Sequence, residues 1–415
     1  MDYFLIAAIL VFLSALFGYI NVRFLKLPNT IGLMLITIVF TFLVFGLSYF
    51  DDTLLNAEKY IITQIDFKWL LLDVMLSFLL FAGALHTNFE HLRVQRWPIF
   101  IFSTLGVLAS TFLVGTILFY MLPLIGFEVN YIYCLLFGSL ISPTDPIAVL
   151  GILKKAGVPK KLETKIVGES LFNDGVGVVI FLTIFQVATL GVAAVEASHI
   201  FELFLVEVIG GIVLGLVLGW LAYRFMRKID DYQIEVIITL AVVMVGTVIA
   251  QQLHMSAPLA MVTAGLMIGN DRSRENAMSE QTEKYVDNFW ELIDILLNTI
   301  LFVLIGMEML VLSFRQDYLL AGLLAIPIIL LSRFLSLLLP INFFKRKLGF
   351  VPRTNLVMTW GGLRGGISIA LALSLTAVME RELFLFITYI VVVFSILIQG
   401  LTIEKLVKKL YKLKT

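Results

Sequence analysis

The sequence alternates between long apolar runs and short polar segments that hold most of the charged side chains. A helix needs about 20 apolar residues to cross the hydrocarbon core of a bilayer. The pattern therefore predicts an all-α polytopic membrane protein with about thirteen membrane-spanning helices. These spans are expected at residues 2–20, 30–49, 68–86, 98–122, 131–151, 165–191, 201–223, 234–251, 256–270, 289–311, 318–341, 354–377 and 383–403.

Composition agrees with this class and excludes others. Of the 415 residues, 60% are hydrophobic and 14% are charged, and the mean hydropathy is +1.00, which separates the chain from ordinary soluble domains. The 30 basic and 30 acidic residues cancel, so no net charge favours nucleic acid as a partner. The single cysteine, Cys134, excludes an internal disulfide and a cysteine-based metal site, and no cofactor is expected.

Basic residues are distributed unevenly along the predicted bundle. The loops after odd-numbered spans and the C-terminal tail hold 24 of the 30 Lys and Arg residues, and the loops after even-numbered spans hold four. Lys and Arg concentrate on the cytoplasmic side of membrane proteins. We therefore expect an integral protein of the cell (inner) membrane, with its N-terminus outside and a short basic cytoplasmic tail at 404–415.

Two predicted spans contain sequences that disfavour a regular helix. Span 5 has Pro143 and Pro146 close to Asp145, and each proline removes a backbone donor and crowds the preceding turn. Irregular backbone at membrane depth survives only where it is buried in protein or lines a wet cavity. Span 12 is weakened in a different way, because Arg364 lies among Gly361, Gly362, Gly365 and Gly366.

The two interrupted helices stand seven spans apart, as in a transporter built from inverted repeats. Such a repeat makes 1–191 and 234–403 the two halves of a transmembrane domain at 1–403, joined by a linker span at 201–223. No residue-level similarity between the halves is evident, so the repeat is inferred from the breaks alone. The core domain is expected to include the broken spans 131–151 and 354–377.

Span 6 contains two carboxylates in the segment ESLFNDG, and helical spacing separates them. Residues four apart share a face, so Glu169 lies under Asn173, and Ser170 lies under Asp174 on a face about 100° round. A guanidinium near the middle of a membrane needs a carboxylate partner. We therefore expect Glu169 with Asn173 to pair with Arg364 and to hold span 6 against span 12.

Asp174 is then left with Ser170 on its own face and with Asp145 and Thr144 from the break in span 5. These groups are hard oxygen ligands of the kind that suit a small cation. No lysine lies beside them in the middle of a span, so desolvation favours the protonated form of Asp174 until a cation arrives. Proton and cation would compete for one site, and a single charge would permit one-for-one exchange of H⁺ for a monovalent cation.

Together these three segments resemble the signatures of the monovalent cation:proton antiporter family of the NhaP and NHE type, the sodium/proton exchangers. The matching residues are Thr144-Asp145-Pro146, Glu169-Ser170-Leu171-Phe172-Asn173-Asp174-Gly175 and Gly361-Gly362-Leu363-Arg364-Gly365-Gly366. The resemblance covers essentially the whole chain and implies an NhaA-like antiporter fold with crossed, unwound spans 5 and 12. It also implies a dimerisation domain, a homodimer and an elevator-like movement.

The resemblance further implies roles for individual residues. The transported cation and the proton would bind Asp174, surrounded by Ser170, Asp145 and Thr144. A stabilising ion-pair network would consist of Glu169, Asn173 and Arg364. Asn173 in place of a second aspartate resembles the electroneutral branch of the family. One position departs, because many members have a glutamate in a Phe-Glu-Ala-Gly-like stretch of span 3, where this chain has Ala82.

The sequence thus predicts a secondary transporter, not an enzyme, that exchanges Na⁺, with Li⁺ as a further candidate, for H⁺. A K⁺/H⁺ antiporter with the same mechanism is the alternative, because oxygen ligands alone do not fix the size of the ion. An intramembrane aspartyl protease using Asp145 and Asp174 is a remote alternative, since those enzymes resemble a Gly-x-Gly-Asp pattern and here the aspartate precedes its glycines. A channel is disfavoured because the sequence lacks a continuous filter loop.

Other polar residues within the spans have simpler interpretations. Asp294 in span 10 and Arg333 in span 11 are expected to form a structural ion pair. His86, at the cytoplasmic end of span 3, is expected to be an interfacial residue rather than a pH sensor. The role of Asn298 in span 10 stays open between a helix-helix hydrogen bond and an approach to the core.

Overall fold

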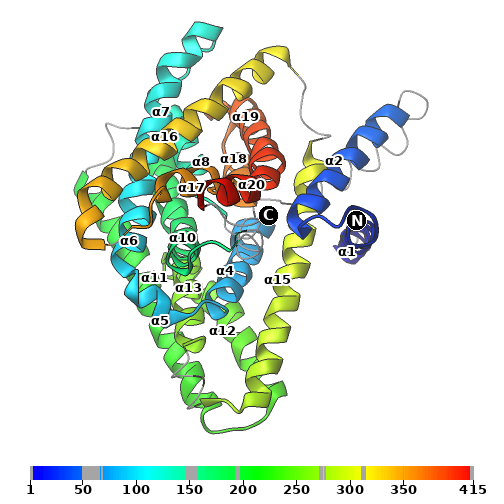
Figure 1. The fold of residues 1–415 in the computed structure, drawn as a ribbon, viewed down its shortest axis with the longest axis vertical. Coiled ribbons are helices and arrows are strands. Elements are labelled where there is room, and N and C mark those ends of the chain that lie inside the picture. Colours follow the sequence, from blue (N-terminus) through cyan, green and yellow to red (C-terminus); the bar gives the residue numbers. More distant parts are fainter. Residues whose placement is uncertain are drawn as a thin grey trace.

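The structure is a computed structural model that describes residues 3–48, 66, 69–145, 153, 157–191, 197–270, 274, 277–309, 315–348 and 350–411. Within these residues the chain is helical apart from short connections and one isolated antiparallel bridge. Long helices run through the molecule at different tilts, and the short helices α8 (Tyr131–Ile141), α17 (Thr354–Trp360) and α18 (Gly366–Leu373) lie among them (Figure 1).

Nine helical segments among the described residues are long and apolar enough to cross a membrane. Their main helices are α1 (Tyr3–Ile20), α2 (Asn29–Leu47), α7 (Val107–Met121), α10 (Lys160–Leu190), α11 (Ala197–Met226), α12 (Tyr232–Gln252), α15 (Glu280–Glu308), α16 (Gln316–Leu348) and α19 (Arg381–Phe394). Besides α8, two further short apolar helices are α4 (Leu76–Leu85) and α13 (Ala257–Ile268). Short segments extend or connect these spans: η1 (Asn21–Leu25), η2 (Trp69–Met75), α5 (Phe89–Val94), α6 (Arg96–Ile101), η3 (Phe102–Gly106), η4 (Leu122–Ile125), η6 (Ala377–Met379), η7 (Ser395–Gln399) and α20 (Gly400–Tyr411).

The prediction of an all-α polytopic membrane protein is confirmed. Each predicted span overlaps one of these helices, with span 5 represented by α8 and span 12 by α17 and α18. The number of membrane crossings and the division into repeats stay predictions.

Helix α11 lies directly against α13 because glycines remove the side chains between them. An added Cβ on Gly211 would lie 2.6 Å from the carbonyl oxygen of Ser256, and one on Gly215 would collide with the carbonyl of Ala260. Small residues spaced four apart allow helices in a membrane to approach at backbone distance. This strip of α11 is therefore a packing surface.

The last span continues farther than the sequence predicted. It was expected to end at 403 with a basic tail at 404–415, but α20 extends the helix to Tyr411. Ile403 and Val407 are one helical turn apart and both are buried, so one face of α20 packs onto the bundle. The hydroxyl of Tyr411 also donates to the carbonyl of Pro352 at 3.0 Å. Residues 404–411 of the predicted tail therefore belong to a docked helix.

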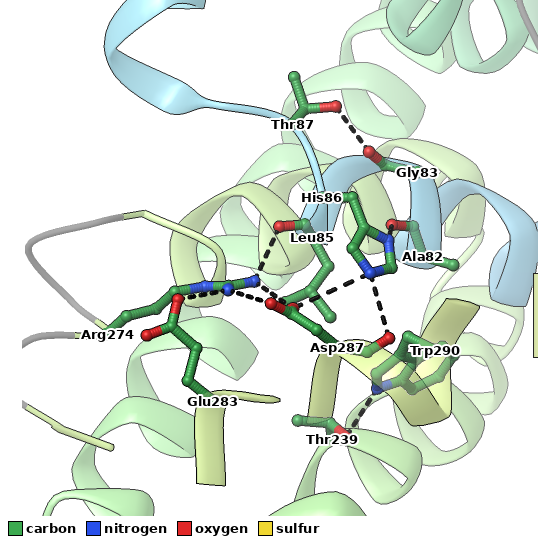
Figure 2. Close-up of polar contacts among 10 residues, drawn as sticks. All are labelled: Ala82, Gly83, Leu85, His86, Thr87, Thr239, Arg274, Glu283, Asp287 and Trp290. Atoms are coloured by element: carbon green, nitrogen blue, oxygen red, sulfur yellow. Dashed lines mark hydrogen bonds and ion pairs between the residues drawn. The ribbon is translucent and has the colours of Figure 1, made fainter. Parts of the chain in front are cut away.

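Buried apolar side chains form two main clusters. The larger one surrounds α8, α10, α16, α18 and α19, and a smaller one lies between α4, α11, α12, α13 and α15. Trp290 is fully buried in the smaller cluster, and its Nε1 donates to Thr239 Oγ1 at 2.8 Å. This bond ties α15 to α12 (Figure 2).

Arg274 joins the end of α4 to the first turns of α15 (Figure 2). Its guanidinium donates to Glu283 Oε1 at 2.8 Å, to both carboxylate oxygens of Asp287 at 2.8 Å, and to the carbonyl of Leu85 at 3.0 Å. His86 adds a contact from its Nε2 to the carbonyl oxygen of Asp287 at 3.2 Å. We name these five residues the Arg274 brace. Burial lowers the pKa of Arg274, but the hydrogen bonds that its guanidinium donates to the two carboxylates outweigh this effect and hold that pKa above its ordinary value.

Arg274→Met is expected to destabilise the protein because it leaves the Leu85 carbonyl and two carboxylates without their shared donor. The carboxylates are partly exposed, at 41% for Glu283 and 32% for Asp287, so water compensates part of the loss. We expect a cost of about 1–3 kcal/mol, seen as a lower melting temperature of the purified protein in detergent.

Arg315→Met is the matched control. Arg315 pairs with Asp317 at 3.0 Å, but both side chains are more than half exposed. Exposed ion pairs contribute little to stability, so this variant should have the same melting temperature as the wild type. Equal melting temperatures for the two variants would contradict a structural role for the brace.

Candidate functional site

The two interrupted helices meet at their breaks. Helix α8 ends at Ile141, and residues 361–365 separate α17 from α18. The backbone N–H of Asp145 donates to the carbonyl of Leu363 at 2.8 Å, which makes the isolated antiparallel bridge. The predicted interruptions of both spans are thereby confirmed. Pro146, which was expected to contribute to the first break, lies outside the described residues.

The crossing requires a glycine at position 365. A Cβ added to Gly365 would lie 2.5 Å from a carboxylate oxygen of Asp145 and 3.0 Å from its Cβ. Real Cβ atoms do not pack that closely, so a larger residue would push the two breaks apart. The glycine cluster therefore lets the Asp145 side chain lie flat against the opposite backbone.

Arg364 binds the end of α8 rather than a carboxylate. Its Nη1 donates to the carbonyl of Pro143 at 2.8 Å and to that of Ser142, and its backbone N–H donates to Ser395 Oγ at 2.9 Å. The predicted direct pairing of Arg364 with the face of Glu169 and Asn173 is wrong. The physical reason is that a helix ending inside the protein leaves carbonyls without intrahelical donors and a partial negative charge, and a guanidinium satisfies both.

The carboxylate of Glu169 is paired with a different arginine. Its Oε1 lies 2.5 Å from Nη1 of Arg333 in α16, and both side chains are only 2% exposed. The expected pair of Arg333 with Asp294 is therefore also wrong, and Asp294 Oδ1 instead accepts from Asn298 Nδ2 at 2.9 Å. Glu169 does hold α10 against another helix, but that helix is α16.

Thr144 is held by α10 through three groups. The hydroxyl of Ser170 donates to the Thr144 carbonyl. Asn173 Nδ2 donates to Thr144 Oγ1 at 2.9 Å, and the Thr144 N–H donates to Asn173 Oδ1 at 3.4 Å. Asn173 thus orients the break in span 5 instead of contacting Arg364. Thr144 and Ser170 therefore lie in contact, and their part in binding an ion stays a prediction.

Asp174 and Asp145 line the same cavity, which has a volume of about 70 Å³. Asp174 is buried, with 6% of its surface exposed. A cavity of this size holds several water molecules or a partly hydrated ion. The N-terminal residues of α18 form one wall and direct the positive end of that helix toward the two carboxylates. Its described lining includes no Lys or Arg: Leu76, Leu79, Leu80, Gly83, Pro143, Asp145, Leu171, Asp174, Asn298, Leu301, Gly365, Gly366, Ile367 and Ser368.

Two arginines near the crossing face a separate and smaller cavity. Arg333 and Arg364 line this space of about 10 Å³ together with Thr359 and Gln399. It is large enough for no more than about one water molecule. The crossing of the breaks thus keeps the guanidiniums on one side and the carboxylates of Asp145 and Asp174 on the other.

Gly83 and Asn298 are part of the cavity wall, but the sequence did not assign either of them to the site. Ala82, the departure in span 3, packs in the cluster around Trp290, and Gly83 lines the cavity instead. Asn298 also lines the cavity and is 6% exposed. Its isolated position in an apolar run was the only signal in the sequence, and that signal does not show which way the side chain points.

Comparison with known proteins agrees with this architecture. The Na⁺/H⁺ antiporter NhaP of Pseudomonas aeruginosa is 50% identical over 412 residues, which cover 98% of this chain and 96% of that protein. The Na⁺/H⁺ antiporter NhaH of Halobacillus dabanensis is 33% identical over 397 residues, with 94% and 93% covered. The structure of the sodium proton antiporter MjNhaP1 from Methanocaldococcus jannaschii at pH 8 has the same fold, with a TM-score of 0.77, 20% identity and 99% of each chain covered.

A sequence model described as "Sodium/hydrogen exchanger, transmembrane" matches residues 11–409. This match extends over nearly the whole chain and includes α8, α10, α17 and α18, the helices that form the crossing and the cavity. The chain belongs to the sodium/hydrogen exchanger family.

Proposed function

We propose that this protein is a secondary transporter that exchanges Na⁺ for H⁺ across the cell membrane through Asp174. The observation that carries the proposal is the cavity shared by Asp174 and Asp145, whose described lining offers oxygen atoms but no Lys or Arg. Relatives at 50% and 33% identity are Na⁺/H⁺ antiporters by name, which supports the same cargo here. The K⁺/H⁺ alternative has no comparable support.

The proton and the cation compete for Asp174. In a buried cavity the neutral, protonated carboxyl is favoured over an uncompensated carboxylate. A Na⁺ ion that enters the cavity supplies the missing positive charge and displaces the proton. The protonated form and the Na⁺-bound form of Asp174 are both neutral, so this one side chain alternates between two cargoes.

The charges around the crossing support exchange of one ion for one ion. Glu169 and Arg333 form an ion pair and Arg364 caps the end of α8, so these charges stay fixed while Asp174 changes its cargo. A proton or a monovalent cation on Asp174 gives the same total charge. The cost of moving net charge through low-dielectric surroundings is therefore the same in both directions.

Asp145, which lines the cavity with Asp174, is the second proposed ligand, and Ser170 and Thr144, which contact each other outside its lining, complete the proposed set. The Ser170 hydroxyl donates its hydrogen to the Thr144 carbonyl, which leaves the lone pairs of its oxygen for a cation. Thr144 Oγ1 accepts from Asn173 and is thereby held in place. Asn173, the Glu169–Arg333 pair and Arg364 then act as supports of the site.

The larger architecture follows the same proposal. Spans 131–151 and 354–377 belong to a moving core, and the protein works as a homodimer in the lipid bilayer with its N-terminus outside and its C-terminus cytoplasmic. The distribution of Lys and Arg between the loops supports this orientation.

Asp174→Ala is expected to reduce Na⁺-driven proton movement to the level of empty liposomes, because it removes the carboxyl that is proposed to alternate between the two cargoes. The measurement is the fluorescence of a pH-sensitive dye in proteoliposomes with an imposed pH gradient, after addition of Na⁺. Asp317→Asn, which alters an exposed carboxylate far along the chain, is the control and should exchange normally.

Wild-type rates in Asp174→Ala would contradict the assignment of the site. In the same assay Li⁺ should drive exchange as Na⁺ does, whereas K⁺ should give little exchange. A rate with K⁺ that equals the rate with Na⁺ would favour the alternative cargo.

Glu169→Gln and Arg333→Gln should each destabilise the protein by about 3–5 kcal/mol, because each leaves a buried charge without its partner. The double variant removes both charges, so its loss should be smaller than the sum of the two single losses. Melting temperatures of purified variants test this, with Glu404→Gln at the partly exposed pair with Lys408 as the control. Additive losses would mean that the two side chains do not stabilise each other.

A further inference from the structure

One face of α15 carries a row of polar side chains that continues from its polar N-terminal turns into the apolar middle of the helix. Asp287, Glu291, Asp294 and Asn298 are spaced by four, three and four residues, so they lie on one side of the helix. The row begins in the Arg274 brace (Figure 2) and ends in the wall of the Asp174 cavity. A rise of about 1.5 Å per residue makes it about 16 Å long.

Asn298 is the member of this row that faces the cavity. It is 6% exposed and stands with Leu301 on the wall contributed by α15, across from the broken helices. Buried amides are rare in apolar helices because both ends of the group need a partner. Its NH₂ end has one, because Nδ2 donates to Asp294 Oδ1 at 2.9 Å.

This hydrogen bond determines which end of the amide remains available to a ligand in the cavity. The NH₂ group and the carbonyl oxygen lie on opposite edges of an asparagine side chain. Asp294 accepts from the NH₂ group one helical turn away, so the oxygen edge of Asn298 is turned away from Asp294. On a residue that lines the cavity, this edge is a neutral hard oxygen of the kind that binds small cations.

We propose that Asn298 supplies an oxygen ligand to the transported cation, and that Asp294 is the positioning residue that holds this ligand in place. The inference rests on the proposed Na⁺/H⁺ exchange at Asp174. A carbonyl oxygen adds affinity without adding charge, so it leaves exchange of one ion for one ion intact. It also gives the cation a contact on α15, outside the elements that carry Asp174 and Asp145.

The test measures the rate of exchange against Na⁺ and Li⁺ concentration in proteoliposomes. Asn298→Ala should raise KM for Na⁺ about tenfold, the effect of losing one polar contact to a charged group, and should change the maximum rate by less than about threefold. The ratio of KM for Na⁺ to KM for Li⁺ should change as well. Asn288→Ala, at an exposed asparagine of the same helix, should match the wild type.

Asp294 variants separate the hydrogen bond from the charge. Asp294→Asn keeps an oxygen that accepts from Asn298, whereas Asp294→Ala removes it. KM for Na⁺ should therefore rise less in Asp294→Asn than in Asp294→Ala. Equal increases in KM would overturn the positioning role, because they would show that the charge of Asp294 is what matters.

A second substitution keeps the ligand role testable if Asn298→Ala folds poorly. Asn298→Gln keeps an amide NH₂ group that can donate to Asp294 and a neutral carbonyl oxygen, so its KM for Na⁺ should stay closer to the wild type than that of Asn298→Ala or Asn298→Leu. Unchanged KM and unchanged Na⁺/Li⁺ ratio in all three variants would overturn the inference. If the wild type exchanges Na⁺ in that experiment, the proposed function still stands, and only the role of Asn298 fails.

Discussion

The hydrogen bond from the Asp145 N–H to the Leu363 carbonyl joins two helices that are both interrupted, and the site depends on it. A broken helix in a membrane exposes backbone groups that lipid cannot satisfy. Here each break serves the other, since Arg364 from one helix caps the carbonyls of Ser142 and Pro143 at the end of the other. Each interrupted helix therefore needs the other to satisfy its backbone groups. Together they place Asp145 against Gly365 at the N-terminus of α18.

The crossing also separates the buried guanidiniums near it from the carboxylates of the larger cavity. Arg333 and Arg364 line one small cavity, and Asp145 and Asp174 line another. Because no guanidinium lies on the side of the carboxylates among the described residues, Asp174 is left to be neutralised by a mobile cation or a proton. The free energy cost of burying a carboxylate in this position is the same property that makes its proton exchangeable.

Much of this arrangement could be predicted from the sequence, and the failures have a common cause. Pro143 and the glycines around Arg364 showed that both helices are interrupted, and helical spacing correctly separated Glu169 from Asp174. Spacing gives the angle of a side chain on its own helix but not the rotation of that helix against its neighbours. The partner of Glu169 was therefore assigned as Arg364 instead of Arg333, and the direction of Asn298 could not be assigned.

Competition between Na⁺ and H⁺ for Asp174 is the central claim, and proton release on Na⁺ binding tests it most directly. Purified protein in weakly buffered detergent solution, near the pH at which the site is half protonated, is titrated with Na⁺ while a pH dye reports released protons. The wild type should release protons in proportion to bound Na⁺, approaching about one per ion as the pH is lowered. Asp174→Asn should release none. Na⁺ binding without proton release in the wild type, or undiminished release from Asp174→Asn, would contradict the account.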